Sequence, residues 1–65
     1  MRFRIISGTA IQEFVERCGS AADALGRVRV LLKAGLPNIR VLDEAGRTYS
    51  FTEIEELADD EADSL

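Results

Sequence analysis

The sequence predicts a small two-layer α+β domain, in which helices cover one face of a three-stranded, mostly antiparallel sheet. Two observations support this class: short segments are rich in β-forming residues, and apolar residues between them recur at helical spacing. The expected order is β-α-α-β-β-α. We expect residues 1–58 to form a single domain and residues 59–65 to form an acidic C-terminal tail that is frayed or disordered.

The expected strands are short. Residues 3–6 and 47–51 are rich in β-branched and aromatic residues, and residues 39–42 add a mainly aliphatic segment. Asp and Gly at the two ends of residues 43–46 favour a hairpin loop built on a type I turn, so the second and third strands should pair directly. The first strand can lie beside either arm of this hairpin, and we favour residues 47–51, which would make the whole sheet antiparallel.

Three helix starts share one pattern, in which a hydroxyl residue stands three positions before an acid or an amide. The pattern begins at Thr9, Ser20 and Thr52, and the Thr52 case matches a capping box best. After Thr9, four apolar residues follow the i, i+3, i+4, i+7 spacing of one helical face: Ile11, Phe14, Val15 and Cys18. The second helix should end just before Gly35, which suits a left-handed stop, and Pro37 cannot continue it.

The boundary between the first two helices is open. The apolar spacing runs almost unbroken across Gly19 and Ser20, so one kinked helix over residues 10–34 is the alternative to two helices. In either arrangement Cys18 shares a face with apolar residues, and we expect it to be a small core residue. The negative end of a helix would raise the pKa of its thiol, so a reactive cysteine is not favoured.

Charge divides the chain into two parts. Residues 1–47 contain all eight basic residues and five of the twelve acidic ones, which gives a net charge of +3. Residues 48–65 contain the other seven acidic residues and no base, which gives a net charge of −7. The positive part can attract an anionic partner that the negative part repels, so the overall charge of −4 describes neither part.

The sequence lacks the residues that most catalytic and metal-binding sites require. The absence of His removes the Ser-His and Cys-His pairs and the usual nitrogen ligand of zinc. No glycine pattern matches a phosphate-binding loop, and a chain of 65 residues has little room for a pocket of about 300 Å³. We therefore expect no enzyme activity, no catalytic residues, no cofactor and no metal. A small-molecule enzyme is the least favoured alternative.

Apolar runs that mark membrane or secretory segments are also missing. A signal peptide needs an apolar run of about 7–15 residues, and a membrane-spanning helix needs about 18. The sequence has neither, so we expect a soluble, cytoplasmic protein with no membrane partner. Its single Cys18 cannot form an internal disulfide, which suits a reducing compartment.

Arginines are expected on the face of the sheet that the helices leave open. Strand alternation would place the arginines and a few aliphatic residues on that open side. The side chains that it would place beneath the helices are Phe3, Ile5, Ile39, Val41, Tyr49 and Phe51. The candidate interaction face comprises Arg2, Arg4, Ile6, Arg40, Leu42 and Arg47. Such a face can bind phosphate groups or a protein partner. The aromatic residues fit the core better than this face, which does not favour the stacking of RNA bases.

The favoured function is a small non-catalytic protein-protein interaction or regulatory module, whose partner is another protein or a second copy of the chain. Weak nucleic-acid binding through Arg2, Arg4, Arg40 and Arg47 is the alternative. The acidic end could solubilise the chain, fold back over the arginines as a latch, or contact a basic partner. The candidate acidic contact comprises Glu55, Glu56, Asp59, Asp60 and Glu61.

One segment resembles a known family. Residues 39–47, followed by residues 52–57, resemble the hairpin and helix that open the N-terminal domain of bacterial translation initiation factor three. The resemblance covers less than a third of the chain and implies the local hairpin-helix arrangement only. The chain as a whole resembles short bacterial proteins of unknown function, and neither resemblance implies an activity or a site.

Overall fold

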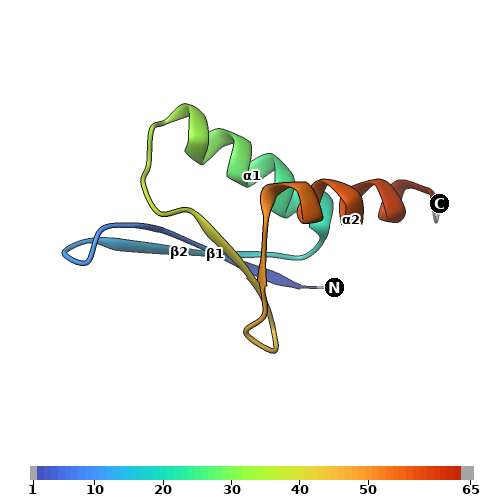
Figure 1. The fold of residues 1–65 in the computed structure, drawn as a ribbon, viewed down its shortest axis with the longest axis horizontal. Helices are drawn as coiled ribbons and strands as arrows, with labels where there is room; N and C mark the ends of the chain where they lie inside the picture. Colours follow the sequence, from blue (N-terminus) through green and yellow to red (C-terminus); the bar gives the residue numbers. More distant parts are fainter. Residues whose placement is uncertain (1, 64–65) are drawn as a thin grey trace.

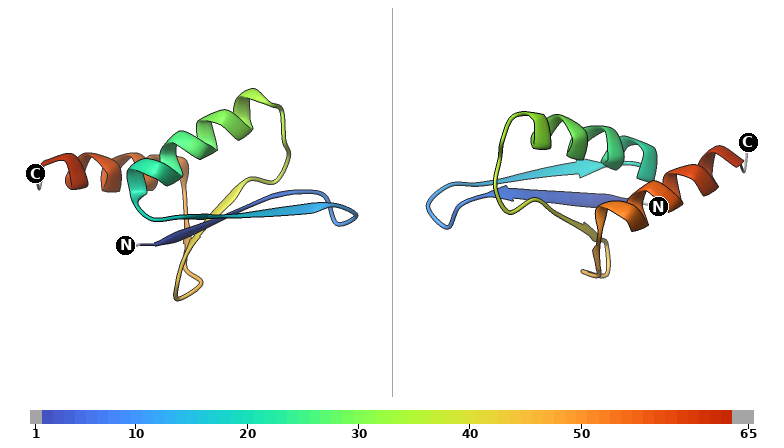
Figure 2. Two further views of the ribbon diagram at one scale, coloured as in Figure 1. Left: turned by 180° about the vertical axis from the view of Figure 1, so that it is seen from behind. Right: turned by 45° about the horizontal axis from the view of Figure 1, so that its top comes forward.

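A four-stranded antiparallel sheet carries two helices on one of its faces (Figures 1 and 2). The computed structural model describes residues 2–63. In chain order the elements are β1 (Phe3–Gly8), β2 (Glu13–Cys18), α1 (Ala21–Lys33), β3 (Arg40–Asp43), β4 (Thr48–Tyr49) and α2 (Phe51–Asp63). The strand order in the sheet is β2-β1-β3-β4. The α+β class is confirmed, whereas the expected three strands and the expected order of elements are wrong in detail.

The segment expected to form the first helix is instead the second arm of a β-hairpin. β2 pairs with β1 over its whole length, from Gly8 opposite Glu13 to Phe3 opposite Cys18. Both helical interpretations, two helices or one kinked helix over residues 10–34, are therefore wrong for residues 10–18. A helix of about nine residues is marginal by itself. Pairing with β1 satisfies the same backbone groups and extends the sheet.

The hairpin loop explains why Thr9 resembled a helix cap. Its hydroxyl accepts a hydrogen bond from the N–H of Gln12 at 3.2 Å, as a capping residue would, but the N–H of Thr9 also donates to the Gln12 carbonyl at 2.8 Å. These bonds reverse the chain. Gly8 makes the reversal possible, since its φ is +109° and a Cβ atom there would overlap the Gln12 carbonyl oxygen.

β1 lies at the centre of the sheet and pairs with β3, not with β4 as we expected. The predicted turn between β3 and β4 is confirmed, because the Asp43 carboxylate accepts from the N–H groups of Ala45 and Arg47, both at 2.9 Å. The third expected strand shrinks to Thr48–Tyr49, since α2 begins at once. This short strand therefore becomes an edge.

Helix α1 begins and ends as the sequence predicts. Ser20 is its N-cap, with a hydroxyl that accepts from the N–H of Asp23 at 3.1 Å. The helix stops at Lys33, and Gly35 follows with a φ of +76°. The buried residues of α1 are Ala21, Ala24, Val28 and Leu31.

Helix α2 begins earlier than we expected. The reciprocal pair of a capping box is made by Ser50 and Glu53, at 3.1 and 3.0 Å, and not by Thr52 and Glu55. This shift places Phe51 in the first turn, 38% exposed, although alternation along a strand had predicted that it lies in the core. The helix runs to Asp63, past the boundary expected at residue 58. Residues 64–65 of the expected tail lie outside the described residues.

The core lies between the sheet and the helices. Phe3, Ile5 and Val41 point from the sheet to the helix side, as strand alternation predicted, and Ile54 of α2 is fully buried with them. The Phe3 ring also meets the Tyr49 ring edge to face, at 5.6 Å between centroids. The helices thus cover one face of the sheet and leave the other face without a second layer.

Candidate anion-binding face

The uncovered face of the sheet gathers arginine and aliphatic side chains from neighbouring strands. Arg4 of β1 lies between Arg17 of β2 and Leu42 of β3, because directly opposite residues of antiparallel strands point to the same side. One step along the strand, Ile6 lies between Val15 and Arg40 in the same way. We call this surface the arginine face; it comprises Arg4, Ile6, Glu13, Val15, Arg17, Arg40, Leu42 and Thr48.

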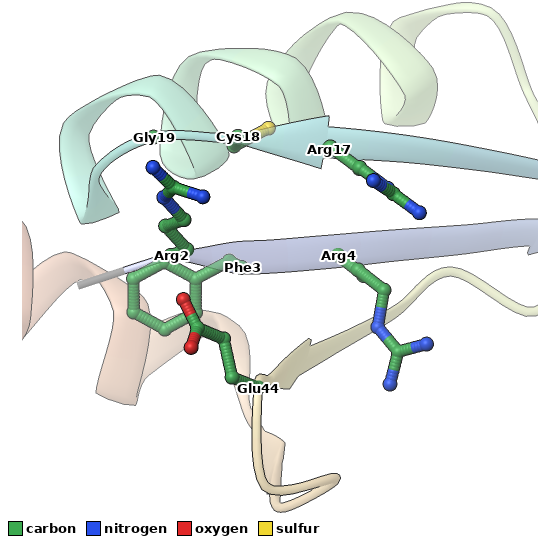
Figure 3. A pocket seen from close by; sticks show the side chains of 7 residues that line it. All are labelled: Arg2, Phe3, Arg4, Arg17, Cys18, Gly19 and Glu44. Carbon is green, nitrogen blue, oxygen red and sulfur yellow. The ribbon is translucent and has the colours of Figure 1, made fainter.

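A hollow opens at one end of the arginine face. Its volume is about 610 Å³, and it is lined by Arg2, Phe3, Arg4, Arg17, Cys18, Gly19 and Glu44. Figure 3 shows the side chains of Arg4 and Arg17 extending from the two neighbouring strands, while Glu44 comes from the turn after β3. This hollow is a depression of the open sheet surface and not an enclosed pocket. The hollow forms because the sheet surface lacks a covering layer.

Three arginines at this hollow have no carboxylate partner within residues 2–63. The ion pairs of the described chain join Arg27 to Glu16, Arg29 to Glu55 at 4.0 Å, Arg40 to Glu13 at 3.4 Å and Arg47 to Glu53 at 3.6 Å. Arg2, Arg4 and Arg17 take part in none of these pairs. Their guanidinium groups are therefore available to an anion from outside the described chain.

The opposition of Arg4 and Arg17 is electrostatically unfavourable in the isolated chain. Like charges directly across an antiparallel pair destabilise a sheet, whereas a bound carboxylate or phosphate between them would turn the repulsion into two attractions. Each guanidinium group also presents a planar set of donors that matches a carboxylate or a phosphate in a two-pronged contact. The geometry therefore suits recognition of an anionic group.

The structure brings together part of the face predicted from the sequence. Arg2 and Arg4 line the hollow, Ile6 and Leu42 are half-buried on the arginine face, and Arg40 lies on that face but pairs with Glu13. Arg47 lies apart, in the turn between β3 and β4. There its guanidinium carbon is 5.1 Å from the centre of the Tyr49 ring and its nitrogen is 3.6 Å from Glu53.

Three residues of the arginine face were missed by sequence reasoning. Glu13, Val15 and Arg17 belong to a segment whose apolar spacing predicts a helix and not a strand. No period-two signal could have placed them, because charged and apolar residues do not alternate over Glu13–Cys18. Phe14 and Val15 are adjacent and both apolar, and Glu16 and Arg17 are adjacent and both charged.

Cys18 lines the hollow from the end of β2 and packs against the core. Burial raises the pKa of its thiol, and the negative charges of Glu16 and Asp23 raise it further, against a smaller opposite effect of Arg27. The sequence also predicted a raised pKa for this thiol, but from the negative end of a helix. The cause differs, since Cys18 ends a strand. A thiol with a raised pKa is mostly protonated near neutral pH and is a poor nucleophile.

The acidic helix lies on the other side of the sheet from the arginine face. α2 packs against α1, and its buried Ile54 joins the core on the helix side (Figure 2). Within residues 51–63, the latch over the arginines is therefore wrong. Of the candidate acidic contacts, Glu61 binds the N-terminus of α1 and Glu55 lies near Arg29, while three others are exposed: Glu56, Asp59 and Asp60.

The described residues give two further results. Among them, no three side chains of His, Cys, Asp or Glu lie close enough together to hold a metal ion. No helix within the same residues combines the length and the apolar character needed to cross a bilayer.

Comparison with known proteins gives no relative. No protein-family model, curated protein or solved structure matches the chain. The resemblance of residues 39–57 to the initiation-factor domain therefore stays a prediction, and the functional argument rests on the arginine face alone.

Proposed function

We propose that this protein is a small non-catalytic binding module whose arginine face binds an acidic segment of a partner protein. One observation carries the proposal: Arg2, Arg4 and Arg17 surround a hollow of about 610 Å³ and have no carboxylate partner within residues 2–63. A side-chain carboxylate of a partner fits this arrangement, because guanidinium groups bind carboxylates through paired hydrogen bonds.

The aliphatic residues beside the arginines favour a peptide as the ligand. Val15 is 55% exposed, and Ile6 and Leu42 are half-buried on the same face. A peptide that alternates acidic and apolar residues would bury this aliphatic surface while its carboxylates meet the arginines. Interfaces of this kind combine a small apolar centre with charged residues at the rim.

Nucleic-acid binding is the less favoured alternative. Proteins that bind single strands stack bases on exposed aromatic rings, and the arginine face carries no aromatic residue. Phe3 is buried, and Phe14 points to the helix side because it lies opposite the buried Ser7. The four arginines proposed for this function are also not assembled, since Arg47 pairs with Glu53.

Binding also suits the lining of the hollow better than catalysis does. The lining offers guanidinium groups, one carboxylate from Glu44 and a thiol with a raised pKa. General acid-base or nucleophilic catalysis needs a group whose pKa is matched to proton transfer or a thiolate. Such a lining serves to hold an anion in place.

The proposal is tested by NMR titration at low salt with three probes: a synthetic peptide of interspersed Glu and Leu residues, a single-stranded RNA oligomer and inorganic phosphate. We expect the peptide to shift the backbone signals of Arg4, Arg17 and their neighbours, and to bind more tightly than the RNA. Tighter binding of RNA would support the nucleic-acid alternative and overturn the proposal. Peptide shifts that fall outside the arginine face would overturn it too.

Charge variants separate the site from general electrostatics. Arg4→Gln and Arg17→Gln should each weaken peptide binding about ten- to a hundredfold, because each removes a charged hydrogen-bond donor worth about 1.5–3 kcal/mol. Lys33→Gln, at the end of α1, changes the net charge equally and should leave the affinity within about twofold. Equal losses in all three variants would show an unspecific charge effect.

A further inference from the structure

The outer edge of β2 is the longest free edge of the sheet. β2 is the end strand of the order β2-β1-β3-β4 and has six residues, whereas β4, at the other end, has two. Within residues 2–63 no strand pairs with this outer edge (Figure 2). An exposed edge strand offers a row of backbone groups to another chain.

β2 lacks several of the features that protect an edge strand. Natural edges are protected by Pro, by a bulge or by charged residues, above all Lys, and Glu13–Cys18 contains neither Lys nor Pro and pairs with β1 without a bulge. Its charged residues are Glu13, Glu16 and Arg17. Phe14 is 44% exposed and Val15 is 55% exposed. A second strand along this edge would cover both side chains, one on each face of the sheet.

The three side chains that β2 places on the arginine face have opposite charges at symmetric positions. They are Glu13, Val15 and Arg17, an acid and a base at equal distances from a central aliphatic residue. If two copies of β2 pair antiparallel about a two-fold axis at Val15, Glu13 of each copy lies opposite Arg17 of the other. Opposite charges at directly facing positions stabilise an antiparallel pair.

The neighbouring two-fold registers lack this complementarity. An axis at Glu16 sets two glutamates opposite each other, and an axis at Phe14 sets Glu13 opposite Val15 of the other copy. An axis perpendicular to the sheet keeps the two arginine faces on the same side, so only residues of the same face can meet. Among these three registers, the Val15 register alone pairs opposite charges.

The same register supplies a carboxylate that Arg17 lacks. Within the chain Arg17 lies opposite Arg4, and no described carboxylate offsets that repulsion. Glu13 of a second copy, which pairs with Arg40 of its own chain at 3.4 Å, would approach Arg17 from its free side and lie between two arginines. Arg17 would then be shared between this carboxylate and an anion at the hollow, whereas Arg2 and Arg4 would stay open, so the dimer does not depend on anion binding.

We propose that two copies of this chain pair antiparallel along β2, about a two-fold axis at Val15, with Glu13 of each copy opposite Arg17 of the other. The product is one continuous eight-stranded sheet with both arginine faces on the same side. Since a single strand pair buries little area, the dimer is weak and forms at high protein concentration.

Sedimentation equilibrium over a wide concentration range tests the dimer. The wild-type chain should show a monomer-dimer equilibrium, and Val15→Lys should weaken it more than about tenfold, because two ammonium groups then face each other at the axis. Val30→Lys is the matched control, since Val30 is 52% exposed on α1, away from the edge. A wild-type chain that stays monomeric at its highest concentration, or equal weakening in both variants, overturns the proposal.

A charge exchange tests the pairing of Glu13 with Arg17. Glu13→Arg alone and Arg17→Glu alone each create like-charged pairs and should weaken the dimer about tenfold. The double variant restores opposite charges in the reverse sense and should recover the wild-type dimer. Failure of the double variant to recover, with its circular dichroism unchanged, excludes this register. Arg4→Gln should leave the dimer intact while it weakens peptide binding, which separates the two proposals.

Cysteine cross-linking identifies the register of the pairing between the two copies of β2. In a Cys18→Ser background, Val15→Cys should form a disulfide-linked dimer under mild oxidation, since the two residues lie opposite each other at the axis. Phe14→Cys and Glu16→Cys report the two neighbouring registers and should cross-link more slowly. Fastest cross-linking at either of these positions, or equal rates at all three, contradicts an axis at Val15.

Discussion

Glu61 near the end of α2 holds the N-terminus of α1, where its carboxylate accepts a hydrogen bond from the backbone N–H of Ala21 at 2.6 Å. Its second oxygen accepts from the N–H of Ala22 at 3.0 Å. The first N–H groups of a helix have no partner inside the helix, and the helix dipole favours a negative charge at this end. A residue expected to lie in a frayed tail therefore joins the two helices.

Glu61→Ala should destabilise the protein by about 1 kcal/mol, since it leaves two N–H groups of α1 without their acceptor. Urea unfolding followed by circular dichroism measures the change. Asp59→Asn is the control, because it removes one exposed negative charge from the same helix. A chain that ends at residue 58 should lose at least as much stability as Glu61→Ala. Equal stability of that shorter chain and the full chain would contradict this role of Glu61.

The position of the α2 cap is testable by two alanine substitutions. Ser50→Ala should cost about 1 kcal/mol, since the hydroxyl of Ser50 accepts from the N–H of Glu53 at 3.1 Å. Thr52→Ala should change the stability by no more than about 0.5 kcal/mol, because Thr52 is exposed inside the first turn. Thermal unfolding of both variants shows whether Ser50 or Thr52 caps α2. A larger loss at Thr52 would restore the cap predicted from the sequence.

Gly8→Ala should be strongly destabilising. The substitution adds a Cβ atom that overlaps the Gln12 carbonyl oxygen, at a φ of +109° that other residues rarely adopt, and a loss of more than about 2 kcal/mol is expected. Gly26→Ala provides the contrast, since Gly26 lies inside α1 with open space around it. There the alanine should stabilise the protein by about 0.5–1 kcal/mol. Thermal melts of the two variants should shift in opposite directions.

Stability should fall in acid through Asp43. The Tyr49 hydroxyl donates to the Asp43 carboxylate at 2.8 Å, and the N–H groups of Arg47 and Ala45 donate to it as well, so the pKa of Asp43 lies below its ordinary value. A lowered pKa stabilises the folded state above the unfolded-state pKa of about 3.9, and this contribution is lost as the pH falls through the folded-state value.

Urea unfolding between about pH 6 and pH 2 measures this dependence. Asp43→Asn should be less stable than the wild type near neutral pH, and the difference should shrink in acid. Tyr49→Phe removes the largest single cause of the lowered pKa and should move the acid transition of Asp43 upward. An Asp43→Asn difference that stays constant over the whole range would rule out this linkage.

Several elements were predictable because their signals are local. α1 has a capping serine at Ser20 and a left-handed glycine at Gly35, and both act within one turn of the helix. The turn after β3 depends on the Asp43 side chain and on Gly46, which has a φ of +87°. The position of Arg4 in β1 was predictable too, because strand alternation is enough to place its side chain on the open face.

The candidate site was only partly predictable, because part of it comes from β2. Sequence reasoning found Arg2 and Arg4 but could not find Arg17, since the apolar spacing from Ile11 to Cys18 fits a helical face. It also grouped Arg47 with them, although Arg47 lies over the Tyr49 ring. Which arginines share a hollow depends on strand pairing, and strand pairing is a contact between distant segments.

The amino-acid sequence by itself determined the α+β class, the end of α1 before Gly35, the turn at residues 43–46 and the side of the sheet on which Phe3, Ile5 and Val41 are buried. Only the tertiary structure decided that Glu13–Cys18 is a strand and that Glu61 reaches the N-terminus of α1. The physical reason is the same for both. Backbone N–H and C=O groups need hydrogen-bond partners, and here both sets of partners lie outside the local segment. The edge of β1 supplies them for Glu13–Cys18, a segment of mixed propensity, and the carboxylate of Glu61 supplies them for the N-terminus of α1.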